Sequence, residues 1–218
     1  MHRYFVTGTD TDVGKTRVAA SLALALKRAG RNPTIVKPVQ TGLAPLEEGD
    51  AQRAARLAGV GFIEIARFEK RADPWSAALA QGLEPLSARA LAATLDALDG
   101  ALVVEGVGGI MAPLNAHEHL GDVAAPAKLQ TVVAIGLRLG CLNHALLTLR
   151  LCRQLALRVS GAVLVERWEP AAEAYRADVM RVLQEKVRVL GILASAPDET
   201  ESVEAGAKLF EPLVNQER

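Results

Sequence analysis

Cysteine is scarce in this sequence, and long hydrophobic runs are missing. The two cysteines, Cys141 and Cys152, are too few for a disulfide framework and lack metal-site spacing, so they suit a reducing compartment as core thiols. No stretch approaches the roughly 18 uninterrupted apolar residues of a membrane-spanning helix, and the opening MHRYFVTG has no basic segment followed by a long apolar run. These absences predict a cytoplasmic protein that is neither exported nor inserted into a membrane.

An excess of charge of either sign is also missing. The chain has 25 basic and 25 acidic side chains, so no net field attracts nucleic acid or an anionic membrane. Methionine and aromatic residues are sparse, while half of the 218 residues are hydrophobic. A chain of this length can bury a full core and fits one large domain over residues 1–218. We therefore expect its partners to be small molecules or proteins.

What the sequence does contain is an alternation of short apolar runs with longer amphipathic ones, typical of a parallel sheet covered by helices. The runs that predict buried strands are Tyr4–Thr7, Thr34–Val39, Ala101–Glu105, Thr131–Leu137, Ser160–Val165 and Val187–Leu193. Predicted helices run from Lys15 to a stop at Gly30, from a Ser87 cap to near Gly100, through Leu147–Leu155 with Asn143 as cap, and over Ala171–Glu185 and Ser202–Val214. Residues 40–75, rich in glycine, proline and charge, predict loops around one short helix, Asp50–Ala58.

The segment FVTGTDTDVGKT, residues 5–16, has the pattern of a phosphate-binding P-loop with one irregularity. Gly8 comes one residue too early, but a predicted strand leads into the loop and a predicted helix follows it. Backbone N–H groups of residues 12–16 can converge on a phosphate, with the Lys15 ammonium reaching the outer phosphates and Thr16 holding Mg²⁺. A less specific interpretation is that Gly-Lys-Thr merely starts a helix. The setting favours a nucleotide site and an α/β fold, a P-loop NTPase-like three-layer sandwich with a mostly parallel central sheet flanked by helices.

Three further ionisable residues follow predicted strands or open a predicted helix. Glu105 ends the apolar run ALVVE, so its side chain emerges at the carboxyl edge of the sheet, where open parallel sheets bind ligands. Asp50 is explained equally well as a metal ligand and as a helix N-cap. Lys37 is either a second cation facing Lys15 across an anionic group or a strand-end lysine that reaches solvent. The KPVQTG turn brings Thr41 close to Lys37.

Five segments together resemble the dethiobiotin synthetase family, the ATP-dependent enzymes that close the ureido ring in biotin synthesis. They are YFVTGTDTDVGKT at 4–16, KPVQTG at 37–42, Asp50, VEGVGG at 104–109 and LGCLNHALLT at 139–148. They follow the family's order over most of the chain, and the early glycine is itself a family feature. The resemblance implies a cyclo-ligase that carboxylates 7,8-diaminopelargonate with CO₂. Ring closure then passes through a carbamic-phosphoric anhydride, releasing ADP and phosphate.

The same resemblance implies roles for individual residues. ATP would be held by Asp12, Val13, Gly14, Lys15, Thr16 and Arg17 in the P-loop, and by Asp50, Glu105, Gly108, Val165 and Glu166 outside it. Thr16, Asp50 and Glu105 would hold Mg²⁺, while catalysis would fall to Thr11, Lys15 and Lys37, the last holding the carbamate. The substrate would contact Thr41, Asn143, His144, Ala145 and Tyr175. Free N–H groups at residues 143–145 would form its carboxylate site near the boundary of an implied homodimer. Tyr175 is also explained by helix packing.

The chain departs from the family where the nucleotide base is read. The family has Asn-Asp after the strand corresponding to Ser160–Val165, and the Asn amide reads the adenine edge. Here residues 165–167 are Val-Glu-Arg, and the later Gly-x-Ile-Pro is replaced by Gly191–Ala194. Buried hydrogen bonds to a ligand give large discrimination, so their loss predicts looser choice among nucleotides, with ATP still the default. Asp12 stands where the family more often has Glu.

Alternatives from other classes are weaker. A P-loop regulatory ATPase that positions DNA or a division complex would carry an additional lysine early in the loop, where Thr9–Asp12 stand, and neutral charge disfavours DNA binding. A cobalamin-pathway amidotransferase domain on a similar fold would need a glutaminase region, for which 218 residues leave no room. His117, His119 and Asp122 could suggest a metal site, but a solvated polar loop is the better explanation.

Overall fold

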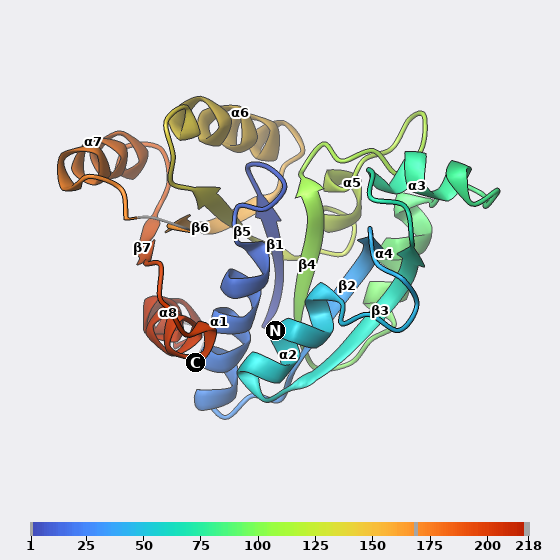
Figure 1. Cartoon of the computed structure of the whole chain (residues 1–218), viewed down its shortest axis with the longest axis horizontal. Helices are drawn as coiled ribbons and strands as arrows, with labels where there is room; N and C mark the ends of the chain where they lie inside the picture. The colour runs from blue at the N-terminus through green and yellow to red at the C-terminus, as the bar shows by residue number, and fades with distance from the viewer. Residues whose placement is uncertain (1, 168–169, 216–218) are drawn as a thin grey trace.

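The computed structural model describes residues 2–167 and 170–215, and its centre is one sheet of seven strands (Figure 1). The strands are β1 (Arg3–Gly8), β2 (Pro33–Thr41), β3 (Gly61–Phe68), β4 (Ala101–Gly109), β5 (Gln130–Gly136), β6 (Arg158–Val165) and β7 (Val189–Leu193). They lie in the order β3-β2-β4-β1-β5-β6-β7, and each pairing between neighbours is parallel. The carboxyl ends of the strands therefore meet at one edge, and β1 is central.

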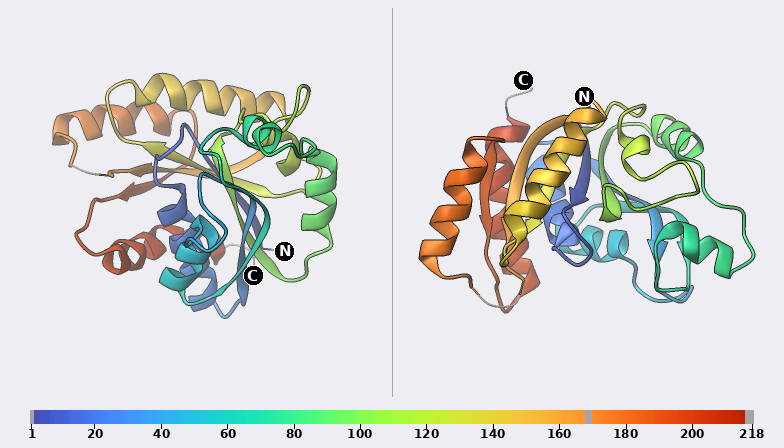
Figure 2. Two further views of the ribbon diagram at one scale, coloured as in Figure 1. Left: turned by 45° about the vertical axis from the view of Figure 1, so that its right-hand side comes forward. Right: turned by 90° about the horizontal axis from the view of Figure 1, so that it is seen from above.

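Helices cover both faces of the sheet and complete three layers (Figures 1 and 2). They are α1 (Lys15–Arg28), α2 (Asp50–Ala58), α3 (Pro74–Ala80), α4 (Ala88–Asp96), α5 (Gly121–Ala124), α6 (Cys141–Gln154), α7 (Glu173–Gln184) and α8 (Glu199–Val214). On one face α1, α2 and α8 bury an apolar cluster that includes Leu22 and Phe210. On the other, α3 to α7 bury a cluster that includes Leu95 and Leu149. The predicted three-layer α/β sandwich is confirmed.

The strongly patterned elements are present as predicted. All six predicted strands occur, and α2 has the predicted bounds. The Ser87 hydroxyl accepts a hydrogen bond from the Ala90 amide at 3.5 Å and caps α4. Gly30 follows α1 with φ 76°, the left-handed conformation that a glycine stop requires. Apolar patterning was sufficient for these elements because the helices bury one side in the core and the central strands bury both faces.

The prediction for residues 40–75 was wrong in one respect, because β3 lies within them. This strand occupies the edge of the sheet beside β2, and its residues are mostly half-buried or exposed. Its Glu64 and Arg67 side chains pair with each other, with Nε 2.6 Å from Oε1. Polar residues on an edge strand break up the continuous apolar run by which buried parallel strands are recognised.

The predicted cap of α6 was also wrong. α6 begins at Cys141, and Gly140 precedes it with φ 89°, so Asn143 lies within the first turn and is not the cap. The leucine-rich sequence of α6 is divided between a buried side and an exposed side, as expected for a core or interface helix. Within residues 2–167 and 170–215, no helix combines the length and the apolarity needed to cross a membrane.

Candidate active site

The segment between β1 and α1 winds tightly around the N-terminus of α1. Gly14 immediately precedes the helix with φ 95°, and a Cβ there would lie 2.6 Å from Cγ1 of Val165, so glycine is needed for this approach. Asp12 also has a positive φ, 59°, which is uncommon for a residue with a side chain. Such alternation of backbone conformation at the positive end of a helix forms an anion-binding nest. The irregular P-loop is therefore a phosphate-binding loop in shape.

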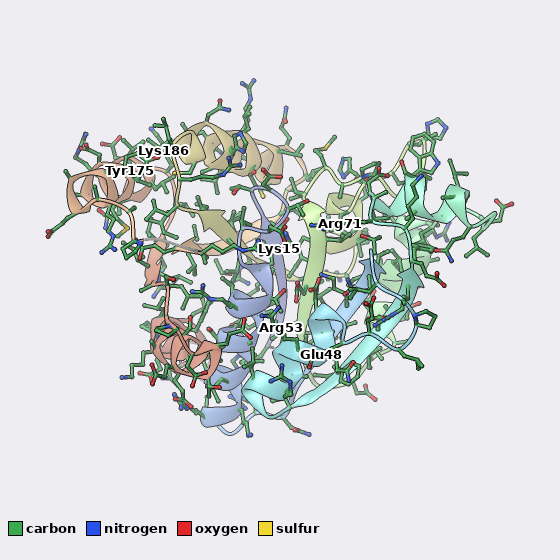
Figure 3. All side chains as sticks on the ribbon, in the orientation of Figure 1. Lys15, Glu48, Arg53, Arg71, Tyr175 and Lys186 are labelled. Atoms are coloured by element: carbon green, nitrogen blue, oxygen red, sulfur yellow. The ribbon has the colours of Figure 1, made fainter. Side chains whose placement is uncertain are left out.

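A cavity of about 840 Å³ opens over this loop at the carboxyl edge of the sheet. Its walls come from the P-loop, the ends of β2 and β4, the start of α2, residues 71–74 and the start of α8. Figure 3 shows Lys15, Arg53 and Arg71, which come from α1, α2 and the segment after β3. Many of the predicted site residues line the cavity, namely Thr11, Asp12, Gly14, Lys15, Thr16, Arg17, Lys37, Thr41, Asp50, Glu105 and Gly108.

A buried ionic cluster lies against this cavity. Lys37 Nζ is 2.7 Å from Asp50 Oδ2 and 2.9 Å from Glu105 Oε1, and it donates to the main-chain oxygen of Gly106 at 3.1 Å. The Thr16 hydroxyl donates to the same Glu105 oxygen at 2.9 Å. Burial by itself would lower the pKa of Lys37, but the charges of Glu105 and Asp50 outweigh it and raise that pKa. Lys37 is thus an ammonium group held between two carboxylates.

This cluster decides two alternatives that the sequence left open. The Lys37 side chain is 1% exposed, so it does not reach solvent. Gly49, not Asp50, is the N-cap of α2, and the Asp50 carboxylate faces Lys37 instead of the helix amides. The structure thus excludes the less specific explanation for each residue, and the functional roles of both stay predictions.

Lys15 lines the same cavity and is 7% exposed. Its Nζ donates to the main-chain oxygen of Asp10 at 2.9 Å, which leaves the ammonium bound to a neutral acceptor. Burial lowers the pKa of Lys15 to about 8, and the positive charge of Lys37 contributes in the same direction. An anion bound beside Lys15 would relieve both the burial of its charge and the repulsion from Lys37.

Asp12 is held by two arginines that the sequence did not single out. Arg167 Nη1 lies 3.1 Å from Asp12 Oδ1 and also donates to the main-chain oxygen of Asp12. Arg71 Nη2 lies 3.8 Å from Asp12 Oδ2. The arginines come from the segments after β6 and after β3, so their convergence depends on loop paths. The local sequence pattern does not predict that these two arginines lie near Asp12.

Val165, the last residue of β6, and Glu166, which follows it, support the P-loop from behind the cavity wall. Val165 is 1% exposed and packs on Gly14, and neither Val165 nor Glu166 nor Val13 is among the described residues that line the cavity. Glu166 Oε1 accepts hydrogen bonds from Arg176 Nε at 2.7 Å and from the Ala171 amide at 2.9 Å. The Glu166 carboxylate thus fixes the start of α7, and its role as a nucleotide contact stays a prediction.

Arg17 connects the P-loop helix to the ends of two strands. Its guanidinium donates to the main-chain oxygens of Glu166 at 3.0 Å and Ala194 at 2.7 Å. Beside it, Ser202 of α8 lines the cavity with a buried hydroxyl that has no hydrogen-bond partner among the described residues. The predicted loss of base recognition at Val165 stays a prediction.

The start of α6 lies apart from this cavity. Asn143, His144 and Ala145 do not line it as the described residues form it, and the His144 amide already donates to the Gly140 oxygen at 3.4 Å. The assumption that the amides of residues 143–145 are all free was therefore wrong, because the helix begins two residues earlier than expected. A substrate that reaches from the cavity to the start of α6 would need further protein surface between the two.

Tyr175 of α7 also lies outside the cavity. Its hydroxyl donates to the main-chain oxygen of Arg138 at 2.7 Å and lies 3.4 Å from Cys141 Sγ. Burial raises the pKa of Tyr175 to about 12, with a smaller contribution from Cys141. Arg138 in turn donates to Asp10 Oδ2 at 2.9 Å, so this chain of contacts runs from α7 to the P-loop. In this structure Tyr175 positions the segment before α6.

The histidine-containing loop shows no metal site. His119 donates its amide to Asp122 Oδ2 at 2.9 Å, and Pro113 and His119 form an isolated antiparallel bridge. In the described part of the chain, no group of three or more His, Cys, Asp or Glu side chains is arranged to hold a metal.

A parallel sheet with a phosphate-binding loop at its central strand, buried lysines and a hydroxyl-carboxylate pair at the same edge defines a P-loop nucleotide-binding protein. A family model described as an AAA domain matches residues 2–205. The chain belongs to the ATP-dependent dethiobiotin synthetase family. It is 40% identical over 164 residues to the synthetase BioD of Rhodococcus jostii, covering 73% of this chain and 71% of that one. With the Anaeromyxobacter dehalogenans (strain 2CP-C) protein of the same name it shares 36% over 207 residues, which is 91% of this chain and 92% of the relative.

Two solved structures with the same fold carry titles that name other functions. The chain is similar to the MinC:MinD cell division complex of Aquifex aeolicus, with a TM-score of 0.59 and 12% identity over 99% of this chain and 95% of the other. A putative plasmid partition protein from Borrelia burgdorferi gives a TM-score of 0.59 and 11% identity over 98% and 100% of the two chains. These likenesses establish the fold, and at such low identity they do not carry a function.

Proposed function

We propose that this protein is a cytoplasmic ATP-dependent dethiobiotin synthetase, which carboxylates 7,8-diaminopelargonate with CO₂ and closes the ureido ring at the expense of ATP. The observation that carries the proposal is the shared cavity in which the P-loop, Lys15 and Lys37 meet. It occurs in a chain that is 36% identical, over 91% of its length, to a dethiobiotin synthetase. Both the cavity chemistry and the relatives support the same reaction.

The reaction gathers negative charge at one place. One amine of the substrate adds to CO₂ and loses a proton, giving a carbamate. A carbamate oxygen then attacks the γ-phosphorus of ATP, and ADP leaves. The second amine attacks the carbonyl carbon of the resulting mixed anhydride, and phosphate leaves as the ring closes. Each step places charge on carbamate or phosphoryl oxygens, so positioned cations are the main requirement.

The cavity provides residues suited to each of these oxygens. In the proposal Lys15 stabilises charge on the transferred phosphoryl group, while Lys37 binds the carbamate. Thr11 and Thr41 line the same cavity, where their hydroxyls would orient the diamine. Lys37 is already held by Asp50 and Glu105, so it needs little reorganisation when the anion arrives. Fixed cations of this kind act by preorganisation.

The residues predicted to hold Mg²⁺ fit that ion. Glu105 Oε2 is buried and has no hydrogen-bond partner among the described residues, and the Thr16 hydroxyl contacts the other oxygen of the same carboxylate. Mg²⁺ is usually held by one or two carboxylates together with substrate phosphates and water. In the proposal Thr16, Asp50 and Glu105 hold it, and when bound it neutralises charge on the ATP phosphates.

A homodimer is part of the proposal. The start of α6, to which the family resemblance assigns the substrate carboxylate, lies outside the cavity that a single copy forms. α6 exposes an apolar face, with Leu139, just before the helix, at 89% and Leu147 at 60% relative exposure. A second copy packed on this face would supply the missing wall. We infer that the N-terminal region of α6 binds the substrate carboxylate across such an interface.

The test is ADP release by the purified protein in the presence and absence of 7,8-diaminopelargonate and bicarbonate. We expect release to require both, with dethiobiotin formed in equal amount. The rival function, a regulatory ATPase switch, predicts release without the diamine. The fold by itself is compatible with the regulatory ATPase function, because a putative plasmid partition protein has the same fold. Diamine-independent ADP release with no dethiobiotin would overturn the proposal.

A further inference from the structure

Arg71 is a cation of the cavity that the mechanism above leaves without a role. Arg71 follows β3 and is labelled in Figure 3. It lines the cavity with Thr11 and Lys15, and its side chain is 89% exposed. Its Nη2 lies 3.8 Å from Asp12 Oδ2, which is longer than a hydrogen bond. An exposed pair of this length contributes little to stability, so the guanidinium is available to another anion.

The base of the Arg71 side chain is nevertheless well placed. A Cβ at Gly42 would lie 3.2 Å from both Cβ and Cγ of Arg71, so the arginine stem lies directly across this glycine. Gly42 has φ 82°, and its amide donates to the Phe68 oxygen at 2.9 Å, which ties the end of β3 to the turn after β2. Thr41, the last residue of β2, directly precedes that turn. The stem therefore starts beside the predicted diamine site and its charged end approaches the P-loop.

The charge of Asp12 is already matched without Arg71. Arg167 approaches Asp12 Oδ1 at 3.1 Å and binds its main-chain oxygen as well. Asp12 therefore has one close and one distant arginine. The distant one carries a positive charge that the described carboxylates near the P-loop do not bind directly. Because Arg71 lies beside the phosphate-binding loop without a close carboxylate partner among the described residues, it is positioned to bind an anionic ligand.

We propose that Arg71 is a catalytic residue that binds the oxygens of the transferred phosphoryl group when a triphosphate enters the cavity. This inference rests on the proposed function, and it adds a third cation to Lys15 and Lys37. The guanidinium leaves Asp12, moves toward the γ-phosphate, and offers two parallel N–H groups to its oxygens. As the carbamate attacks and ADP leaves, Arg71 stabilises the charge that spreads over those oxygens. Covalent bonds and protons follow the course given above, since Arg71 contributes charge alone.

The test compares Arg71→Ala and Arg71→Lys with the wild type. We expect Arg71→Ala to lower kcat by about 100-fold, the usual effect of removing one transition-state donor, with little change in KM for the diamine. Arg71→Lys should recover part of the loss, and added guanidinium should partly restore Arg71→Ala. The matched control is Arg181→Ala, which removes another exposed arginine paired with a carboxylate at 3.3 Å on α7. Its kcat should equal that of the wild type.

A binding measurement separates this inference from the proposed function. Arg71→Ala should bind a nonhydrolysable ATP analogue about tenfold more weakly and bind ADP unchanged, whether or not the protein makes dethiobiotin. The wild type could lack synthetase activity while Arg71→Ala still weakens binding of the ATP analogue and not of ADP. That result would overturn the proposed function but support the contact between Arg71 and the γ-phosphate. If the wild type is active and Arg71→Ala has the same kcat and the same affinity for the analogue, the inference about Arg71 is wrong while the proposed function stands. An equal loss of analogue and ADP affinity would also overturn it, because the contact would then not be to the γ-phosphate.

Discussion

Lys37 is buried, and burying an ammonium group is unfavourable unless anions pair with it. Asp50 and Glu105 meet it at 2.7 and 2.9 Å, so its charge is compensated before a substrate arrives. The free-energy cost of burying the Lys37 charge is therefore offset when the protein folds, before any substrate binds. Three acceptors fix the position of Nζ. A substrate anion need only exchange with one of them.

Replacing Lys37 by Gln should separate binding from chemistry. Lys37→Gln removes the charge but keeps a long polar side chain, so ATP affinity should stay within a few-fold of the wild type because the P-loop amides and Lys15 remain. Dethiobiotin formation should fall by at least about 100-fold because the carbamate loses its cation. Nucleotide binding by calorimetry and product formation by mass spectrometry are the measurements. Lys208→Gln, an exposed lysine on α8, is the control. Full activity of Lys37→Gln would remove Lys37 from the mechanism.

Val165 carries the prediction about nucleotide choice. Its side chain has no donor or acceptor, is 1% exposed and packs on Gly14, so it offers a base no hydrogen bond. We expect GTP and CTP to replace ATP with kcat/KM values within about 100-fold, because rejection of an analogue depends on buried polar groups left unpaired. Steady-state kinetics with the three nucleotides give the answer. A preference for ATP of several hundredfold would show that another part of the wall reads adenine.

The sequence predicted the centre of the site better than its rim. Lys15, Lys37, Asp50 and Glu105 come together because they follow strands or begin a helix at one edge of a parallel sheet, and that geometry is encoded in the pattern. Arg71 was not predicted, since its approach to the P-loop depends on how an irregular segment crosses Gly42. A pattern does not encode the path of such a segment.

Among the elements, α1 and α8 pack most closely where Gly206 faces Ser21. A Cβ at Gly206 would lie 2.8 Å from both Ser21 Cβ and Leu193 Cδ1, closer than such atoms pack. Gly206→Ala should therefore destabilise the protein by about 1–3 kcal/mol through overpacking, although alanine favours a helix. Urea denaturation measures the change. Gly61→Ala is the control, since nothing lies within 4 Å of the added methyl group. A gain in stability for Gly206→Ala would mean that α8 can shift freely on α1.

The edge strand β3 shows where element prediction stops. Central strands have both faces covered, so they read as uninterrupted apolar runs. β3 pairs with β2 on one side only, and its Phe62 is 46% exposed. Its identity as a strand comes from hydrogen bonding to β2, a partner more than twenty residues away in sequence. Local composition could not supply that information.

At the scale of the whole molecule, the exposed side of α6 predicts self-association. Leu147 on the helix and Leu139 just before it are 60% and 89% exposed, and Leu146 between them is 39% exposed. We expect the wild type to be a dimer by light scattering and Leu147→Glu to weaken it at least tenfold, because a buried charge without a partner would face the second copy. Leu46→Glu is the control, because Leu46 is fully exposed in the loop before α2. A monomeric wild type with full activity would contradict the proposed shared carboxylate site.

The central place of β1 has a consequence for how the protein is inactivated. β1 has hydrogen-bonded neighbours on both sides, β4 and β5, and its residues Tyr4 to Val6 are inaccessible to solvent. Amide hydrogens of this strand should exchange only when the entire sheet comes apart. Heating should therefore abolish turnover no later than the temperature at which the molecule melts, because the nucleotide loop follows directly from this strand.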